Sequence, residues 1–332
     1  MKQTVLSGLR PTGRVHLGNY FGAVRHWVQL QDQYECFYFI ADWHALTSDY
    51  ADPSNIRAST FEAVADWLAA GLDPQRSTIF LQSEVKEHAE LHLLLSMITP
   101  LPWLERVPTF KDQQAQVEDK DLNTYGFLGY PLLQTADIIV YRANFVPVGE
   151  DQASHLELSR EIVRRFNNFY GPVFPEPLPL FTATPKVPGL DGRKMSKSYG
   201  NTIGLTASAD EIRRLTMTMF TDPNRIRRSD PGNPDICNLY QFHRLFSDPE
   251  TQARIDRECR GAMIGCVDDK KLIAEIMIEA LRPIRERREQ IDRDPSIVRD
   301  VLREGNRKAR ERAAATMEQV RKAVKIDYPE LR

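Results

Sequence analysis

Short apolar runs alternate with helical patterns along the first half of the chain. The runs are rich in β-branched and aromatic side chains, which predicts buried strands. They comprise residues 4–6, 36–40, 77–81 and 145–148. Between them, apolar positions recur at helical spacing, with a start expected near Gly18 and a helix end at Gly71. This alternation predicts an α/β fold with a doubly wound parallel sheet.

The second half of the chain follows a different pattern. Residues 167–188 are rich in proline and lack a clear period, so we expect a loop or crossover there. From residue 210 onward, apolar positions recur at helical spacing and no strand is evident. The pattern therefore predicts an α/β portion followed by an all-α portion, without internal repeats.

Composition limits the classes of protein. The chain has 332 residues, 42% of them hydrophobic, enough for about two domains. The formal net charge is −2, but residues 285–325 carry 13 Lys and Arg against 8 Asp and Glu. That excess is typical of a solvated helical face with ion pairs, and attraction of phosphates is the alternative.

The expected location is the cytoplasm. No segment approaches the roughly 18 consecutive apolar residues that span a bilayer, and the N-terminus does not resemble a secretory signal. The four cysteines do not make a disulfide framework in that compartment. We therefore expect no membrane partner.

Two loops carry candidate phosphate-binding chemistry. The first, residues 7–23, is rich in glycine and joins a strand to a helix N-terminus, where free N–H groups favour an anion. His16 and Asn19 are three residues apart there and can face one ligand. The second, residues 189–198, places Lys194 and Lys197 among glycines and serines, so it can close over a polyphosphate. The alternatives are an ordinary turn with a capping histidine and a basic linker.

Asp137 is the third candidate, because it interrupts an otherwise apolar helix. A buried carboxylate costs several kcal/mol unless it is paired. The residue is either a salt-bridged structural aspartate or a carboxylate that accepts from an N–H group of a ligand. A further Gly-containing turn, residues 149–152, follows the strand at 145–148.

Together these segments resemble a known family. His16-Leu17-Gly18-Asn19 and Lys194-Met195-Ser196-Lys197-Ser198 are similar to the HIGH and KMSKS motifs of class I aminoacyl-tRNA synthetases. Ala136-Asp137, residues 149–152 and residues 227–234 narrow the resemblance to tryptophanyl-tRNA synthetases. The resemblance extends over essentially the whole chain.

The resemblance implies a two-step ligase. Tryptophan and ATP form tryptophanyl-adenylate and pyrophosphate, and the tryptophanyl group is then transferred to the 3′ end of tRNA(Trp). It also implies Mg²⁺ with the ATP, and a homodimer. The alternatives are a tyrosyl-tRNA synthetase and a synthetase-like binding or regulatory protein that does not charge tRNA.

The resemblance also implies roles for individual residues. The catalytic set is His16, Asn19, Lys194 and Lys197. The ATP-binding set is Arg10, Pro11, Thr12, Gly18, Asn19, Gly149, Glu150, Asp151, Val187, Lys194, Met195, Ser196, Lys197 and Ser198. The tryptophan-binding set is Leu6, His44, Tyr130, Gln134, Asp137, Val146, Val148 and Gln152. Indole N–H is a donor only, so Asp137 is its complementary partner.

The domain organisation follows from the same resemblance. Residues 1–190 are expected to form a Rossmann-like catalytic domain, with an inserted dimer-contact segment at about 101–125. The KMSKS linker spans 191–204. A helical anticodon-binding domain is expected at 205–290, and residues 291–332 are expected to pack back toward the catalytic domain.

One resemblance is incomplete. Some tryptophanyl-tRNA synthetases hold an iron–sulfur cluster with four cysteines of the helical domain. Here Cys237, Cys259 and Cys266 match three of these positions, and Asp269 stands at the fourth. Such clusters usually take four thiolates, so we favour a lost site over ligation by three thiolates and a carboxylate. No other metal site is expected from the protein alone.

Overall fold

A five-stranded parallel sheet forms the centre of the structure, a computed structural model that describes residues 2–107, 122–149, 153–181 and 187–331. Its strand order is β3-β2-β1-β4-β5. The strands are β1 (Thr4–Leu9), β2 (Glu35–Ile40), β3 (Ser77–Leu81), β4 (Phe145–Val148) and β5 (Leu178–Phe181). The predicted α/β fold is confirmed. Because the chain order reverses between β1 and β4, their carboxyl ends border the crevice where such sheets bind ligands.

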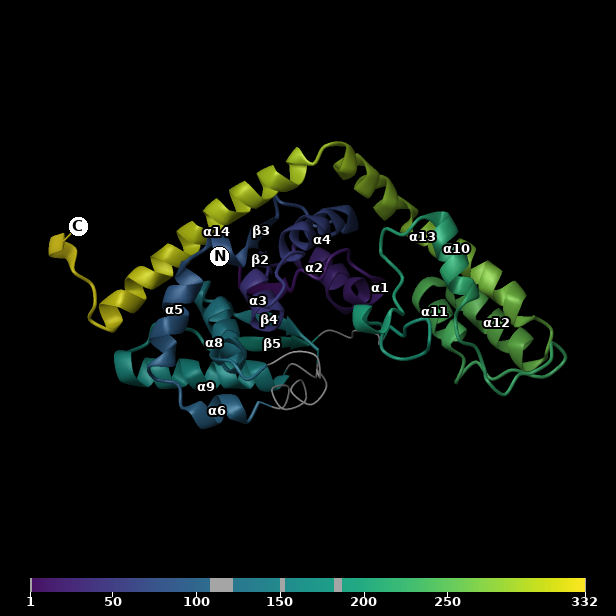
Figure 1. Cartoon of the computed structure of the whole chain (residues 1–332), viewed down its shortest axis with the longest axis horizontal. Helices are drawn as coiled ribbons and strands as arrows, with labels where there is room; N and C mark the ends of the chain where they lie inside the picture. Colours follow the sequence, from purple (N-terminus) through teal and green to yellow (C-terminus); the bar gives the residue numbers. More distant parts are fainter. Residues whose placement is uncertain (1, 108–121, 150–152, 182–186, 332) are drawn as a thin grey trace.

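Helices connect the strands and cover both faces of the sheet (Figure 1). The helix expected near Gly18 begins at Leu17, and Gly71 ends α4 in a left-handed conformation with φ of 110°. In chain order the helices of this part are α1 (Leu17–Asn19), the π-helical η1 (Tyr20–Val24), α2 (Arg25–Leu30), α3 (Asp42–Asp49), α4 (Ile56–Ala70), the 3-10 turn η2 (Gln82–Glu84), α5 (Glu87–Ser96), α6 (Leu101–Glu105), α8 (Tyr125–Val140) and α9 (Ala153–Tyr170).

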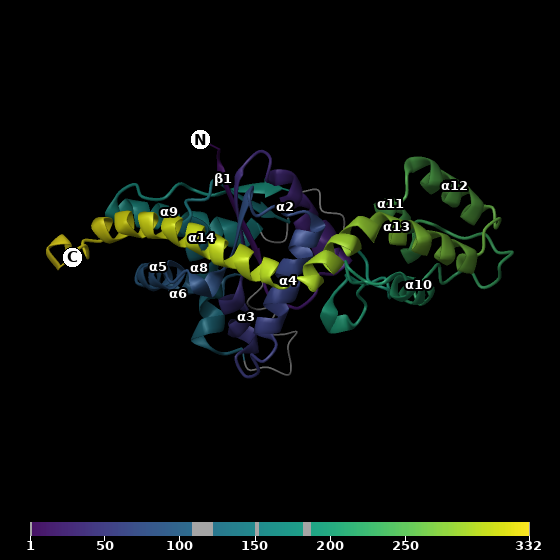
Figure 2. The same ribbon diagram turned by 90° about the horizontal axis from the view of Figure 1, so that it is seen from above.

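The second half of the described chain is helical: α10 to α13 lie to one side of the sheet, and α14 runs back across it (Figures 1 and 2). Two helices of 28 residues each, α13 and α14, meet at an angle and run along most of the molecule. The elements of this half are η4 (Lys197–Tyr199), α10 (Ala209–Met217), α11 (Asn238–Phe246), α12 (Pro249–Arg260), α13 (Cys266–Arg293), α14 (Ser296–Ala323) and η5 (Pro329–Leu331). None of the helices within the described ranges is long and apolar enough to cross a membrane.

The fifth strand, β5, was not predicted. It lies in the proline-rich segment 167–188, pairs with β4 and places Pro179 opposite Val146. None of its four side chains is buried, so it lacks the apolar signal of the inner strands. A proline is tolerated there because β5 is at the edge of the sheet.

Two apolar cores lie on the two faces of the sheet. On one face Trp27 stacks on Tyr38 with ring centroids 4.7 Å apart, and Trp67 meets Trp27 edge-on. This core continues into the helical half through residues such as Leu281 and Ile284 of α13. The other core lies among α5, α8, α9 and α14. The long helices thus take part in both cores.

Helix α14 covers the free edge of the sheet at β3. The backbone N–H of Leu81 donates to Asn306 Oδ1 at 2.9 Å, so a side chain replaces the missing strand. Gly305 makes this approach feasible: a Cβ atom there would lie 1.8 Å from the carbonyl oxygen of Ile79. The lack of a side chain at residue 305 therefore sets how closely the helix approaches the strand.

We expect Gly305→Ala to destabilise the fold by about 3 kcal/mol or more, because the added methyl group would overlap rigid backbone. Chemical unfolding monitored by circular dichroism measures this. Gly22→Ala is the matched control, since a Cβ atom at Gly22 meets nothing within 4 Å. Equal unfolding free energies for the two variants would contradict the close approach of α14 to β3.

Candidate functional site

The two candidate loops are joined by backbone pairing. The N–H of Leu17 donates to the carbonyl of Ile203 at 2.9 Å, and the N–H of Leu205 donates to that of Val15 at 2.8 Å. His16 and Gly204 form the antiparallel bridge between these bonds. The first loop is therefore held directly against the segment that follows the second.

Side chains strengthen this junction. Lys197 Nζ donates to the carbonyl oxygen of Thr12, and the N–H of Gly18 points to Met195 Sδ at 3.3 Å. Met195 is buried although the lysines beside it are exposed. Ser196 Oγ and Ser198 Oγ lie 2.8 Å apart. The structure thus brings together the glycine-rich turn and the two-lysine loop, although about 180 residues separate them.

Asn201 fixes the shape of the second loop. This buried side chain accepts from the N–H of Ser196 at 2.8 Å and donates to Asp191 Oδ1 at 2.7 Å. Gly189 makes room for it, since a Cβ atom there would overlap the Asn201 amide. Val187 accepts from the N–H of Met195 at 3.2 Å, so it joins the base of the same loop.

His16 is buried at the start of α1. Its Nδ1 accepts from the N–H of Asn19 at 3.3 Å, which leaves the ring proton of the neutral form on Nε2. Burial, followed by the positive charge of Lys197, lowers the pKa of His16 to about 4. Gly18 leaves room for the imidazole ring, because a Cβ atom at residue 18 would lie 2.9 Å from it. Near neutral pH the ring is an uncharged donor.

A cavity of about 500 Å³ opens at the carboxyl ends of β1 and β4. Two sets of predicted residues meet in it: one from the turn after β1 and one from around α8 and β4. The predicted lining residues are Leu6, Arg10, Thr12, Asn19, His44, Tyr130, Gln134, Asp137, Val146, Val148 and Gly149. The volume falls within the range usual for small-molecule sites.

Asp137 lies in this cavity and is almost completely buried. His44 Nε2 is 2.7 Å from Oδ2, His88 Nδ1 is 2.6 Å from Oδ1, and Gln82 donates to Oδ1 at 2.8 Å. Burial raises the pKa of Asp137, but the hydrogen bonds from His44 and His88 and the electrostatic effect of these two residues outweigh it and hold the pKa below its usual range. The cavity therefore contains an ionised carboxylate.

A buried tyrosine orients His88. Burial raises the pKa of Tyr141 well above its usual value, so its hydroxyl keeps its proton and donates to His88 Nε2 at 2.7 Å. The other ring nitrogen, Nδ1, then carries the proton directed at Asp137. A chain of donors leads to one side of the carboxylate, while Oδ2 remains on the side of the half-buried His44.

Comparisons with known proteins identify the family. Residues 1–282 match the family model described as tRNA synthetases class I (W and Y). The tryptophan–tRNA ligase of Thermotoga maritima is 53% identical over 326 residues, covering 98% of this chain and 99% of that protein. The chain belongs to the tryptophanyl-tRNA synthetases. A solved tryptophanyl-tRNA synthetase from Campylobacter jejuni, complexed with ADP and tryptophan, is 34% identical and superposes with a TM-score of 0.88, covering 97% of this chain and 99% of that one.

Part of the predicted site of this synthetase lies outside the described residues. Glu150, Asp151 and Gln152 are in that part. Several predicted residues lie in or next to the two joined loops but do not line the cavity: Pro11, His16, Gly18, Val187, Lys194, Met195, Ser196, Lys197 and Ser198. Their predicted roles, like those of the lining residues, stay predictions.

The three cysteines of the incomplete motif lie near an arginine, and Asp269 is bonded to a histidine. Arg225 Nη1 points to both Cys259 Sγ and Cys266 Sγ at 3.9 Å, and burial raises the pKa of Cys259 to about 11. Asp269 accepts from His243 Nε2 at 2.9 Å. Within residues 2–107, 122–149, 153–181 and 187–331, no three His, Cys, Asp or Glu side chains are arranged to hold a metal ion. The lost-site interpretation stays a prediction.

Several polar residues around the site were not predicted. His88, Gln82 and Tyr141 surround Asp137, and Asn201 shapes the second loop. Each is a single polar residue in a local pattern that gives no functional signal. Of these four residues, only His88 could have been noticed in the sequence, because it is a polar residue in a Leu-rich helix, just as Asp137 is a polar residue in an apolar helix.

We expect the ring of His16 to titrate with a pKa of about 4, because it is buried and faces Lys197. Since the unfolded chain takes up this proton near pH 6.5, His16 lowers stability as the pH falls from about 6.5 to about 4. NMR titration of ¹⁵N-histidine-labelled protein measures it. Lys197→Met should raise this pKa, whereas the control Lys194→Met should leave it in place. A value near 6.5 in the parent protein would overturn the neutral-ring assignment.

Proposed function

We infer that this chain is a tryptophan–tRNA ligase that activates L-tryptophan with ATP and then charges tRNA(Trp). The observation that supports this best is that one cavity is lined by the first loop, a candidate phosphate-binding turn, on one side and by the ionised Asp137 on the other. The second loop is bonded to the rim of that cavity through Lys197 and Thr12. A nucleotide and an indole can therefore lie in the same cavity.

The tryptophan side is proposed to select by complementarity. The indole N–H reaches Asp137 Oδ2 beside His44, and a ligand without a donor leaves this carboxylate with an unfilled bond. Sites built in this way reject such analogues strongly. Tyrosine also has a donor, so the apolar wall must distinguish the two rings. The residues that we propose for that wall and for the polar contacts are Leu6, Tyr130, Gln134, Val146, Val148 and Gln152.

The ATP side is proposed to stabilise charge rather than transfer protons. An oxygen of the tryptophan carboxylate attacks the α-phosphorus, the bond from this phosphorus to the bridging oxygen breaks, and pyrophosphate leaves with the electron pair. Lys194 and Lys197 oppose the growing negative charge, and neutral His16 donates from Nε2. Mg²⁺ accompanies the polyphosphate and supplies further positive charge. Arg10, Pro11, Thr12, Gly18, Asn19 and residues 149–151 bind the rest of the nucleotide.

In the second step a hydroxyl of the terminal ribose of tRNA attacks the tryptophanyl carbonyl, and AMP leaves. The basic C-terminal helices are proposed to contact tRNA phosphates. Much of their charge is already paired, however: Arg307 of α14 bonds Glu304 and Glu311, and Arg321 bonds Glu90. Ion pairs therefore account for part of this face.

The expected cytoplasmic location stays a prediction.

A homodimer is proposed at the face formed by α5, α6 and the start of α8. Leu93 on α5 and Met97 directly after this helix are exposed, as are Leu101 at the start of α6 and Tyr125 at the start of α8. Tyr125 lies against His92 of α5, with ring centroids 6.4 Å apart, so the start of α8 is next to this helix. We propose that these exposed side chains form one apolar patch. The patch borders the expected dimer-contact segment at about 101–125. A second copy of the chain is the proposed occupant.

Pyrophosphate exchange tests the substrate. We expect exchange with tryptophan to exceed exchange with tyrosine, and Asp137→Asn to lower kcat/KM for tryptophan by roughly 100-fold, because a charged hydrogen bond is lost. The KM for ATP should stay within about two-fold. Asp300→Asn, at an exposed site on α14, is the control. Faster exchange with tyrosine would favour a tyrosyl-tRNA synthetase, and adenylate formation without charging of tRNA(Trp) would favour the non-charging alternative.

Sedimentation equilibrium tests the dimer. Met97→Glu should weaken association at least about ten-fold, because it places a charge in an apolar interface. Met263→Glu is the matched control: Met263 is 64% exposed and Met97 70% exposed, but Met263 lies between α12 and α13. A monomeric parent protein, or equal effects of the two variants, would rule out this interface.

A further inference from the structure

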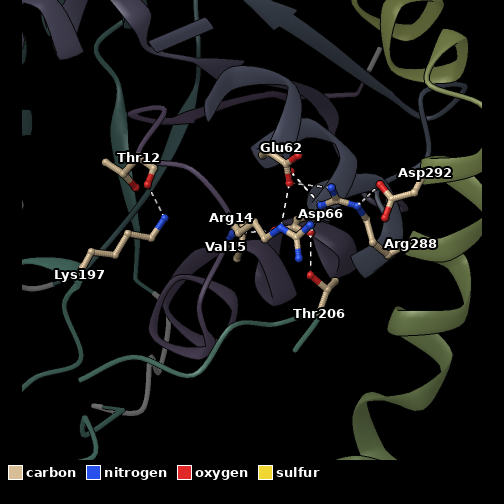
Figure 3. Close-up of polar contacts among 9 residues, drawn as sticks. All are labelled: Thr12, Arg14, Val15, Glu62, Asp66, Lys197, Thr206, Arg288 and Asp292. Atoms are coloured by element: carbon tan, nitrogen blue, oxygen red, sulfur yellow. Dashed lines mark hydrogen bonds and ion pairs between the residues drawn. The ribbon is translucent and has the colours of Figure 1, made fainter. Parts of the chain in front are cut away.

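Asp66 of α4 is a fully buried carboxylate outside the cavity. Its Oδ2 accepts from the N–H of Val15 at 2.7 Å, and its Oδ1 accepts from Thr206 Oγ1 at 3.2 Å (Figure 3). Arg288 Nη1 of α13 donates to the same Oδ1. Three segments that are distant in the sequence therefore meet at one side chain.

Two of these segments are the paired backbones at the junction of the first loop and the segment that follows the second loop. Val15 belongs to the first loop, and Thr206 directly follows Leu205, whose N–H bonds the carbonyl of Val15. The carboxylate thus closes the open end of the antiparallel pairing by bonding one group from each side. Without the Asp66 carboxylate, the N–H of Val15 and the hydroxyl of Thr206 would lose their shared partner, because no other described contact joins these two groups.

The third segment, α13, supplies the charge that makes burial feasible. Arg288 is itself nearly buried and also donates to Glu62 Oε2 at 2.7 Å and to Asp292 Oδ1 at 2.8 Å (Figure 3). An unpaired buried carboxylate would cost several kcal/mol, and this guanidinium offsets that cost. The position of α13 is thereby tied to the junction of the two loops.

The charge of Asp66 also acts on the second lysine of the KMSKS loop. Burial lowers the pKa of Lys197, and the negative charge of Asp66 partly opposes this. Lys197 Nζ bonds the carbonyl of Thr12, three residues before Val15 (Figure 3). One carboxylate therefore supports both the position of the first loop and the charged state of the lysine that faces it.

We propose that Asp66 is a positioning residue for adenylate formation: it holds the two ATP-binding loops in register and, through Arg288, ties that register to α13. This inference rests on the proposed function, since it takes adenylate formation as the reaction. Asp66 lies on α4, away from the tryptophan pocket, so its effect is expected on the ATP side alone.

Tryptophan-dependent pyrophosphate exchange by the full-length protein provides the test. Asp66→Asn should lower kcat roughly 30-fold or more and raise the KM for ATP, because it removes a charge-assisted bond to each loop. Binding of tryptophan alone, measured by equilibrium dialysis, should change by less than about two-fold. Thr206→Val, which removes only the hydroxyl, should lower kcat by about five-fold in the same way.

The control is Asp292→Asn. It removes a carboxylate from the same arginine but touches neither loop, so it should lower the melting temperature without the ATP-side loss. The proposal is overturned if Asp66→Asn behaves like Asp292→Asn, or if it weakens tryptophan and ATP equally. If Asp66→Asn does not fold, Thr206→Val decides, and an unchanged kcat in that variant overturns the proposal. Failure of the parent protein to exchange with tryptophan would instead count against the proposed function.

Discussion

The backbone pairing between residues 15–17 and 203–205 is the contact on which the site depends. It holds the second loop against the turn that follows β1, where Lys197 contacts Thr12 and Met195 contacts Gly18. Loop closure over such a separation is entropically costly. Several hydrogen bonds together offset this cost. The side chains of Asn201 and Asp66 add to them by holding the two segments.

The site combines two electrostatic environments of opposite sign, one inside the cavity and one in the loops beside it. Asp137 keeps its negative charge through donors from His44, His88 and Gln82. The lysine loop keeps positive charge for a polyphosphate, and His16 next to it is driven neutral. Charge is thus placed where a ligand group of the opposite character is expected, and removed where it would add to repulsion.

The sequence predicted the fold better than the details of the site. Apolar runs identified β1 to β4 because each of these strands contains buried apolar side chains, and Gly71 marked a helix end because only glycine adopts that conformation readily. Edge strand β5 escaped because its side chains are not buried.

The motifs located the loops, since glycines and paired lysines are visible in the sequence. His88 and Asp66 were missed because their partners are far away in the chain. Asn201 was missed because the hydrogen bonds that it makes within its own loop leave no pattern in the sequence. The expected lack of a four-thiol site is consistent with the arginine that points to two of the sulfurs. The path of the two long helices was also beyond prediction, because helical spacing gives length and not direction.

The contact of Gly305 with β3 has a consequence for synthesis on the ribosome. The strand leaves the ribosome long before α14 does, so its hydrogen-bonding edge is uncovered while the middle of the chain is still being made. Exposed strand edges recruit other strands. A nascent chain of this protein is therefore most vulnerable to mispairing until its long final helix emerges, and release of that helix completes the sheet.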